Sequence, residues 1–195
     1  MSKQASGTAL ERLLKDRIAV LDGAMGIMIQ GYPLKERDFR GDTFSDHPCP
    51  LKGNNDILSV TRPELIKKIH TAYLEAGADI IETNTFSGTS IAQADYQLEN
   101  QISLLNRAAA EVARSAADAY MASIDREVFV AGAVGPTNKT LSISPDVNRP
   151  GYRATNFQEL KLAYREQILA VIDGGGDLIL NYPKFETLNC KATIK

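Results

Sequence analysis

The chain has 195 residues, of which 44% are hydrophobic and 24% charged, and its formal net charge is -2. This composition is typical of a folded globular protein and excludes a disordered chain. No stripe of Lys and Arg indicates a nucleic-acid partner, and no apolar run approaches the length of a membrane span. A length of 195 residues predicts one domain. Because the first 17 residues do not resemble a secretory signal, we expect a cytoplasmic protein.

Residues 18–26, Ile-Ala-Val-Leu-Asp-Gly-Ala-Met-Gly, form a short apolar run that ends in an acid and a glycine. Such runs, when turn residues bound them, are typical of strands buried on both faces of a parallel sheet. We therefore predict the first strand here, after a helical lead-in over residues 1–17. Asp22 falls at the carboxyl end of this strand, where α/β barrels gather their functional loops. The alternative is that Asp22 and Gly23 form only a turn.

Three further apolar runs alternate with helical patterns. The runs begin near residues 79, 128 and 177, and the predicted helices cover 62–76, 90–123 with a break near Asn100, and 157–172. Two joints between helix and strand repeat the same order of helix end, glycine, acid and apolar run, with Asp79 and Asp177 as the acids. This repetition indicates one structural unit used more than once.

Repeated strand, crossover helix and strand implies parallel pairing with right-handed crossovers. The four predicted strands are half of the eight that a TIM barrel contains. We therefore predict an α/β fold of the (β/α)8 TIM-barrel class, here about the first four βα units, which is a half-barrel. The polar segments 31–61 and 139–155 are predicted to be long loops, which in compact domains are usually functional or disordered.

The two cysteines, Cys49 and Cys190, lie far apart in the sequence. This spacing is neither a disulfide framework nor a closed zinc site. His47 and Cys49 could supply two metal ligands, but their segment, 45–50, is interpreted more simply as an irregular loop.

A set of motifs then identifies a family. The motifs are Leu-Asp-Gly-Ala-Met-Gly at 21–26, Asp-Phe-Arg-Gly at 38–41, Cys-Pro-Leu-Lys-Gly-Asn-Asn-Asp at 49–56, Gly-Ala-Asp-Ile-Ile-Glu-Thr-Asn-Thr-Phe at 77–86, Ala-Asp-Tyr at 94–96, Gly-Pro-Thr-Asn at 135–138 and Ser-Ile-Ser-Pro-Asp-Val-Asn at 142–148. They closely resemble the homocysteine-binding domain of cobalamin-dependent methionine synthases, within the homocysteine S-methyltransferase family. The resemblance extends from about residue 13 to residue 191.

The resemblance implies that residues 1–195 are part of one homocysteine-binding domain, a barrel that holds L-homocysteine at its C-terminal face with the sulfur bound to zinc. Zinc removes the proton of the thiol, and the thiolate takes a methyl group from methylcobalamin to give methionine. The implied partners are the cobalamin- and folate-binding domains of the same enzyme. By position, the resemblance assigns substrate binding to Asp22, near the amino group, to its neighbour Gly23, and to Thr83 and Asn84.

The sequence also departs from the family. The family's zinc ligands are three cysteines, but Cys49 belongs to a loop motif and Cys190 stands where the family usually has alanine, so we find no ligand for zinc or cobalamin. Tyr182 replaces a glutamate that helps to hold the amino group of the substrate, which predicts that this second acid is lost. Pro183 is expected to interrupt pairing at the end of the fourth strand. We therefore expect the isolated chain to be inactive in zinc-dependent transfer.

The alternative function is that of a non-catalytic half-barrel module for binding or assembly. Its first and fourth strands would leave unpaired edges, and unpaired edges tend to associate. Two four-stranded halves could close one barrel by self-association. A soluble dimer would favour this alternative.

Overall fold

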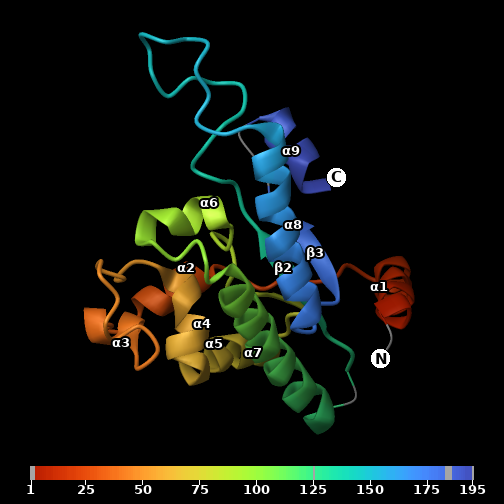
Figure 1. Cartoon of the computed structure of the whole chain (residues 1–195). Coiled ribbons are helices and arrows are strands. Elements are labelled where there is room, and N and C mark those ends of the chain that lie inside the picture. The colour runs from red at the N-terminus through yellow and green to blue at the C-terminus, as the bar shows by residue number, and fades with distance from the viewer. Residues whose placement is uncertain (1–2, 125, 183–185, 195) are drawn as a thin grey trace.

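The computed structural model describes residues 3–124, 126–182 and 186–194. Within these residues three parallel strands form one sheet in the order β1-β2-β3, and helices surround it (Figure 1). The strands are β1 (Ile80–Glu82), β2 (Phe129–Val134) and β3 (Leu178–Asn181). The helices are α1 (Lys3–Asp16), α2 (Met25–Gln30), α3 (Glu36–Arg40), α4 (Leu58–Thr61), α5 (Pro63–Glu75), α6 (Ser90–Gln93), α7 (Ile102–Ser123), α8 (Phe157–Asp173) and α9 (Thr187–Ile194), with 3-10 turns at Asn55–Ile57 and Ala94–Tyr96.

The order and direction of the strands follow the predicted pattern of repeated units. Ile80 pairs with Phe129, and Ala131 pairs with Leu178, both in parallel register. Helix α7 leads from β1 to β2, and α8 leads from β2 to β3. The prediction of a parallel α/β fold is therefore confirmed.

The first predicted strand differs from the expectation. Residues 18–26 contribute only one parallel bridge, between Leu21 and Ile80, at the free side of β1. The Ile18 and Val20 side chains are 87% and 50% exposed. The prediction of a strand buried on both faces is therefore wrong, because the segment makes a single bridge to β1 and the side chains of Ile18 and Val20 remain largely in contact with solvent.

The repeated joints have a common physical basis. The Asp79 carboxylate accepts a hydrogen bond from the Val20 amide at 2.8 Å, and the Asp177 carboxylate accepts one from the Val130 amide at 2.9 Å. Each acid thus fastens the start of its strand to the preceding segment. Arg17 and Arg126 pair with buried Asp79, which holds the pKa of this carboxyl far below its usual range.

Helices α5, α7 and α8 lie side by side against the sheet (Figure 1). The face of α7 that they cover is rich in alanine, which allows the helices to approach closely; its buried alanines are Ala109, Ala110, Ala113, Ala116 and Ala117. The predicted helix over 90–123 is divided, as expected near Asn100, because Gln97 adopts a positive φ of 54° and α7 begins only at Ile102.

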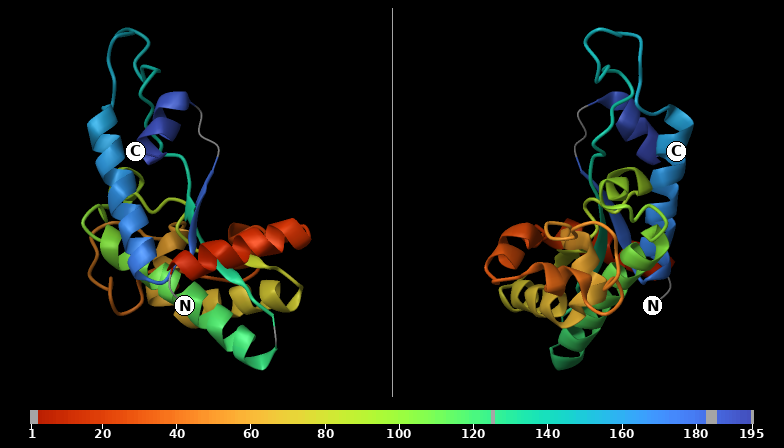
Figure 2. Two further views of the ribbon diagram at one scale, coloured as in Figure 1. Left: turned by 90° about the vertical axis from the view of Figure 1, so that its right-hand side faces the viewer. Right: turned by 60° about the vertical axis from the view of Figure 1, so that its left-hand side comes forward.

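The long segment 135–156 extends away from the sheet and returns to α8 (Figure 2). Its apolar side chains Ile143 and Val147 are 61% and 91% exposed. Helix α9 packs against α8 on the same side of the molecule. In the part of the chain that the structure describes, none of the helices combines the length and apolar character that crossing a bilayer requires.

Candidate active site

A cavity of about 580 Å³ opens at the carboxyl ends of β1 and β2. Its lining comes from segments that are distant in the sequence: 21–26, 53–56, 82–84, Phe86, Ser87, Tyr96, Ala133 and Tyr182. In parallel α/β sheets ligands bind in crevices outside the carboxyl ends of the strands. The position of this cavity therefore makes it the candidate active site.

Asp22 is placed in the cavity by the bridge between Leu21 and Ile80. Its Oδ2 accepts a hydrogen bond from the Glu82 amide at 3.0 Å, whereas its Oδ1 is buried and has no hydrogen-bond partner among the described residues. Burial raises the pKa of Asp22 to about 7, and the neighbouring Glu82 carboxylate acts in the same direction. Asp22 thus presents a desolvated acceptor that suits a cationic donor.

Glu82 is a second acid in the same cavity, and the sequence analysis did not select it. The Tyr182 hydroxyl lies 2.6 Å from each of its carboxylate oxygens and donates to it. The Tyr182 ring also packs edge-on against Phe86, with the ring centroids 5.2 Å apart. Burial raises the pKa of Glu82, and burial together with the adjacent Glu82 raises the pKa of Tyr182, so the phenol remains a donor.

The expectation that the family's second acid is lost concerns position 182, where the structure places the Tyr182 hydroxyl in the cavity beside Glu82; that expectation stays a prediction. Tyr182 stands in the fourth predicted strand, as the sequence comparison placed it, but it contacts Glu82 from β1. The signal for Glu82 was present in the sequence, because an acid follows Ile80 and Ile81 directly, as Asp22 follows Leu21. Pro183 lies outside the described residues, and so does its expected effect on pairing.

Thr83 and Asn84 line the cavity, but the Thr83 hydroxyl and the Asn84 side-chain nitrogen form hydrogen bonds inside the protein. The Thr83 hydroxyl accepts from the Ala133 amide at 3.1 Å and lies 2.6 Å from the Thr85 hydroxyl. The Asn84 amide donates to the Asn55 carbonyl at 2.7 Å. Thr83 therefore fixes the end of the sheet, and Asn84 fixes the adjacent wall.

Gly23 lines the cavity beside Asp22 and packs against Tyr73. A Cβ atom at this position would lie 2.9 Å from the Tyr73 hydroxyl, so a larger residue would displace that ring. All four predicted substrate-binding residues, Asp22, Gly23, Thr83 and Asn84, thus meet in one cavity. Their roles toward a substrate stay predictions.

Asp56 is a further buried acid in the lining that the sequence analysis did not select. It accepts hydrogen bonds from the Ser87 amide at 3.0 Å and from the Gln93 side chain at 3.4 Å, and burial raises its pKa to about 7. Its bonds join the loop after β1 to the segment 53–56. Nothing in the polar segment 31–61 distinguished this acid from its neighbours.

The cavity does not match the zinc site that the family resemblance implies. Its described lining contains carboxylates, amides and hydroxyls but neither Cys nor His. Across residues 3–124, 126–182 and 186–194, no group of three or more His, Cys, Asp and Glu side chains could hold a metal ion. Cys49 and Cys190 are both free thiols.

Together these features define a parallel α/β protein with a cavity that is lined by acidic side chains and lies at the carboxyl ends of its strands. The chain belongs to the homocysteine S-methyltransferase family, whose sequence model matches residues 19–195. It is also similar to solved structures of the homocysteine methyltransferase MmuM from Escherichia coli.

The metallated form of MmuM is 26% identical to this chain, with a TM-score of 0.70 over 94% of this chain and 60% of that one. The oxidised form is 25% identical, with a TM-score of 0.70 over 94% and 59%. The apo form is 25% identical, with a TM-score of 0.57 over 86% and 50%. The chain thus spans about 60% of the length of the first two of these structures.

Proposed function

We propose that the cavity binds L-homocysteine and that residues 1–195 are part of a homocysteine S-methyltransferase domain of the methionine synthase type. The observation that carries this proposal is the buried, unpartnered Oδ1 of Asp22. An amino-acid ligand carries an ammonium group, which would give this oxygen a charged hydrogen-bond donor. Glu82 adds a second negative group beside it.

The remaining predicted residues would act by shaping the cavity. Gly23 leaves room for the ligand beside Tyr73, while Thr83 and Asn84 hold the walls at the ends of β1 and of segment 53–56. If homocysteine is anchored by its amino group at Asp22 and Glu82, its thiol would be free to point away from these two acids. In the cobalamin-dependent methionine synthases that the sequence resembles, zinc would activate the thiol and methylcobalamin would supply the methyl group.

We assign no transfer step to this chain, because the described cavity offers no thiolate for zinc. The proposal is that the isolated chain binds homocysteine without methylating it. Transfer would require the missing zinc ligands and the cobalamin- and folate-binding partners that the resemblance implies.

The test is calorimetric titration of the purified chain with L-homocysteine at pH 8, under reducing conditions, with zinc and separately with a chelator. We expect equal binding in both, and at least about a tenfold loss in Asp22→Asn, which corresponds to ~1.4 kcal/mol. Exposed Asp42 provides the control variant Asp42→Asn, which should bind as the original chain does. Unchanged binding by Asp22→Asn would refute the assignment of the amino-group site.

A second candidate function is that of a half-barrel assembly module. It is favoured by the incomplete burial of residues at the two edges of the sheet. Ile18 and Val20 are exposed at one side, and every residue of β3 at the other side is only partly buried. Two copies could cover these edges by pairing them. Sedimentation should then detect a dimer that Val20→Lys disrupts, whereas a monomer at all concentrations would exclude this function.

A further inference from the structure

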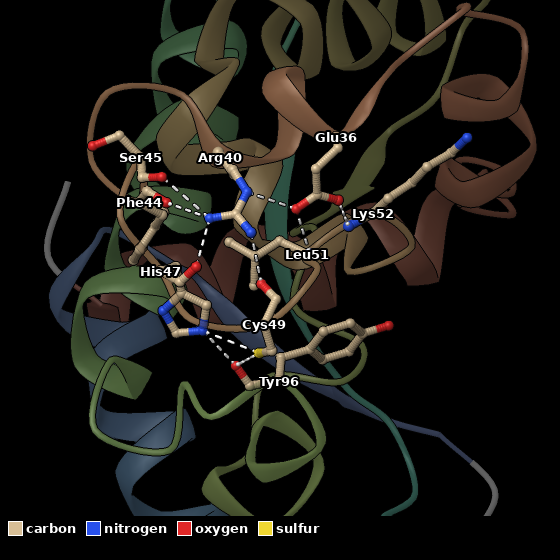
Figure 3. Close-up of polar contacts among 9 residues, drawn as sticks. All are labelled: Glu36, Arg40, Phe44, Ser45, His47, Cys49, Leu51, Lys52 and Tyr96. Carbon is tan, nitrogen blue, oxygen red and sulfur yellow. Dashed lines mark hydrogen bonds and ion pairs between the residues drawn. The ribbon is translucent and has the colours of Figure 1, made fainter.

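The loop that carries His47 and Cys49 is fixed by the adjacent ion pair of Arg40 and Glu36 (Figure 3). Arg40 donates to the His47 carbonyl at 2.6 Å and to the Cys49 carbonyl at 3.0 Å. Glu36 pairs with Arg40 at 2.8 Å and accepts from the amides of Leu51 and Lys52, each at 2.8 Å. The backbone of residues 47–52 is thus held at several points by two side chains of α3.

This arrangement turns the side chains of His47 and Cys49 toward each other (Figure 3). The Cys49 Sγ lies 3.3 Å from the His47 Nε2. The Tyr96 carbonyl oxygen, from a distant part of the chain, lies 2.7 Å from that nitrogen and 3.1 Å from the sulfur. An edge-on contact between the rings of Phe44 and His47 further fixes the imidazole.

Three potential ligand atoms of different kinds therefore form a small triangle. In a tetrahedral zinc site the Zn–S distance is about 2.3 Å and the Zn–N distance about 2.1 Å, which places sulfur and nitrogen about 3.6 Å apart. The observed 3.3 Å is close to this separation. By the same geometry the carbonyl oxygen would lie about 3.4 Å from the nitrogen and about 3.6 Å from the sulfur, so it would need to move outward by about 0.5–0.7 Å from the observed 2.7 Å and 3.1 Å.

The ligand types also indicate which metal would bind. A thiolate and an imidazole favour zinc and related soft cations over magnesium or calcium, which prefer oxygen ligands. Binding would release the thiol proton to solvent, because the thiolate is the ligand, and the imidazole would have to carry its proton on Nδ1 instead of on the Nε2 that faces the Tyr96 carbonyl. The partial burial of both side chains leaves an approach for the ion and for a water ligand.

We propose that His47 Nε2, Cys49 Sγ and the Tyr96 carbonyl oxygen form a zinc-binding site, with water completing the coordination. This site is separate from the acidic cavity and does not depend on the proposed function. The side chain of Tyr96 lines that cavity, so the metal would tie segment 47–52 to one of its walls. A structural role follows, namely that zinc stiffens the wall at Tyr96.

The test uses the full chain after treatment with a chelator and its removal, titrated with Zn²⁺ and with Co²⁺. We expect one equivalent of metal and, with Co²⁺, a near-ultraviolet band from the thiolate. Cys49→Ser should abolish the band, and His47→Gln should weaken binding at least about tenfold. Cys190→Ser is the matched control, because Cys190 lies on α9 next to Asn181, and it should bind as the original chain does.

A measurement on the unmutated chain avoids any folding defect of the variants. Zinc should protect Cys49, but not Cys190, from alkylation by iodoacetamide, as mass spectrometry of peptides reports. Equal alkylation of Cys49 with and without zinc would overturn the proposal. Retention of the cobalt band by Cys49→Ser would overturn it as well.

Discussion

Replacing Asp22 by Asn should stabilise the protein above pH 7 while it removes the amino-group site. The pKa of Asp22 is raised from 3.8 to about 7 in the folded protein. A carboxyl with a raised pKa contributes its stability at low pH and loses it as the pH rises through the folded value. At pH 8 the folded state therefore carries an ionised, partly desolvated group that the unfolded state exposes fully to water.

The size of this effect follows from the two pKa values. At about 1.4 kcal/mol for each tenfold change in proton affinity, the difference between 3.8 and about 7 corresponds to about 4 kcal/mol. Asp22 is only partly buried, so screening by solvent reduces the expected effect to about 2 kcal/mol. An Asn side chain has no charge, and its oxygen can still accept the hydrogen bond from the Glu82 amide.

Urea unfolding of the original chain and of Asp22→Asn measures this difference. The variant should be more stable by about 2 kcal/mol at pH 8, and its advantage should fall to less than half at pH 5, where the folded carboxyl is protonated. Asp42→Asn, at an exposed position, should show no such gain. A variant that is less stable than the original chain at pH 8, or an advantage that is equal at both pH values, would refute the reasoning.

Other substitutions test the environment of the site and of the core. His70 is fully buried, and neither of its ring nitrogens has a hydrogen-bond partner among the described residues. Burial lowers the pKa of His70 to about 4, so the protein should lose about 3 kcal/mol between pH 7.5 and pH 4 through this group. His70→Leu should lack that loss in urea unfolding, and an identical pH profile would contradict it. Tyr182→Phe removes a hydrogen bond that lowers the pKa of Glu82, so this pKa should rise in a carbon NMR titration; a fall would contradict the contact. Arg126→Met removes one of two cations from buried Asp79 and should cost about 2 kcal/mol in the same unfolding assay; no change would show that Arg17 suffices.

The sequence was sufficient to predict the parallel α/β pattern because the joints carry their information locally. Glycine ends a helix, and an acid such as Asp79 or Asp177 then opens an apolar strand. The exposure of residues 18–26, by contrast, could not be predicted from the residues next to them in the sequence. An apolar run shows that its side chains favour burial, but not whether other elements cover them. Here the segment makes one bridge to β1, and Ile18 and Val20 stay exposed.

The local sequence likewise predicted part of the site but not the contacts between distant residues. Asp22 could be selected because it ends an apolar run, and Glu82 carries the same signal at the end of Ile80 and Ile81. The contact between Tyr182 and Glu82 joins residues 100 positions apart, and it depends on the register of β1, β2 and β3. No local pattern contains that register, so the sequence could not predict that Tyr182 would contact Glu82.

The acids of the cavity connect its stability to its choice of ligand. Asp22 and Glu82 lie together with raised pKa values, which means that burying their charges is unfavourable in the empty cavity. A ligand that brings a positive charge relieves this cost, whereas a neutral ligand of the same shape leaves it in place. Since a ligand that binds only the folded state also stabilises it, the same partly buried carboxylates that destabilise the free protein favour an ammonium compound as its ligand.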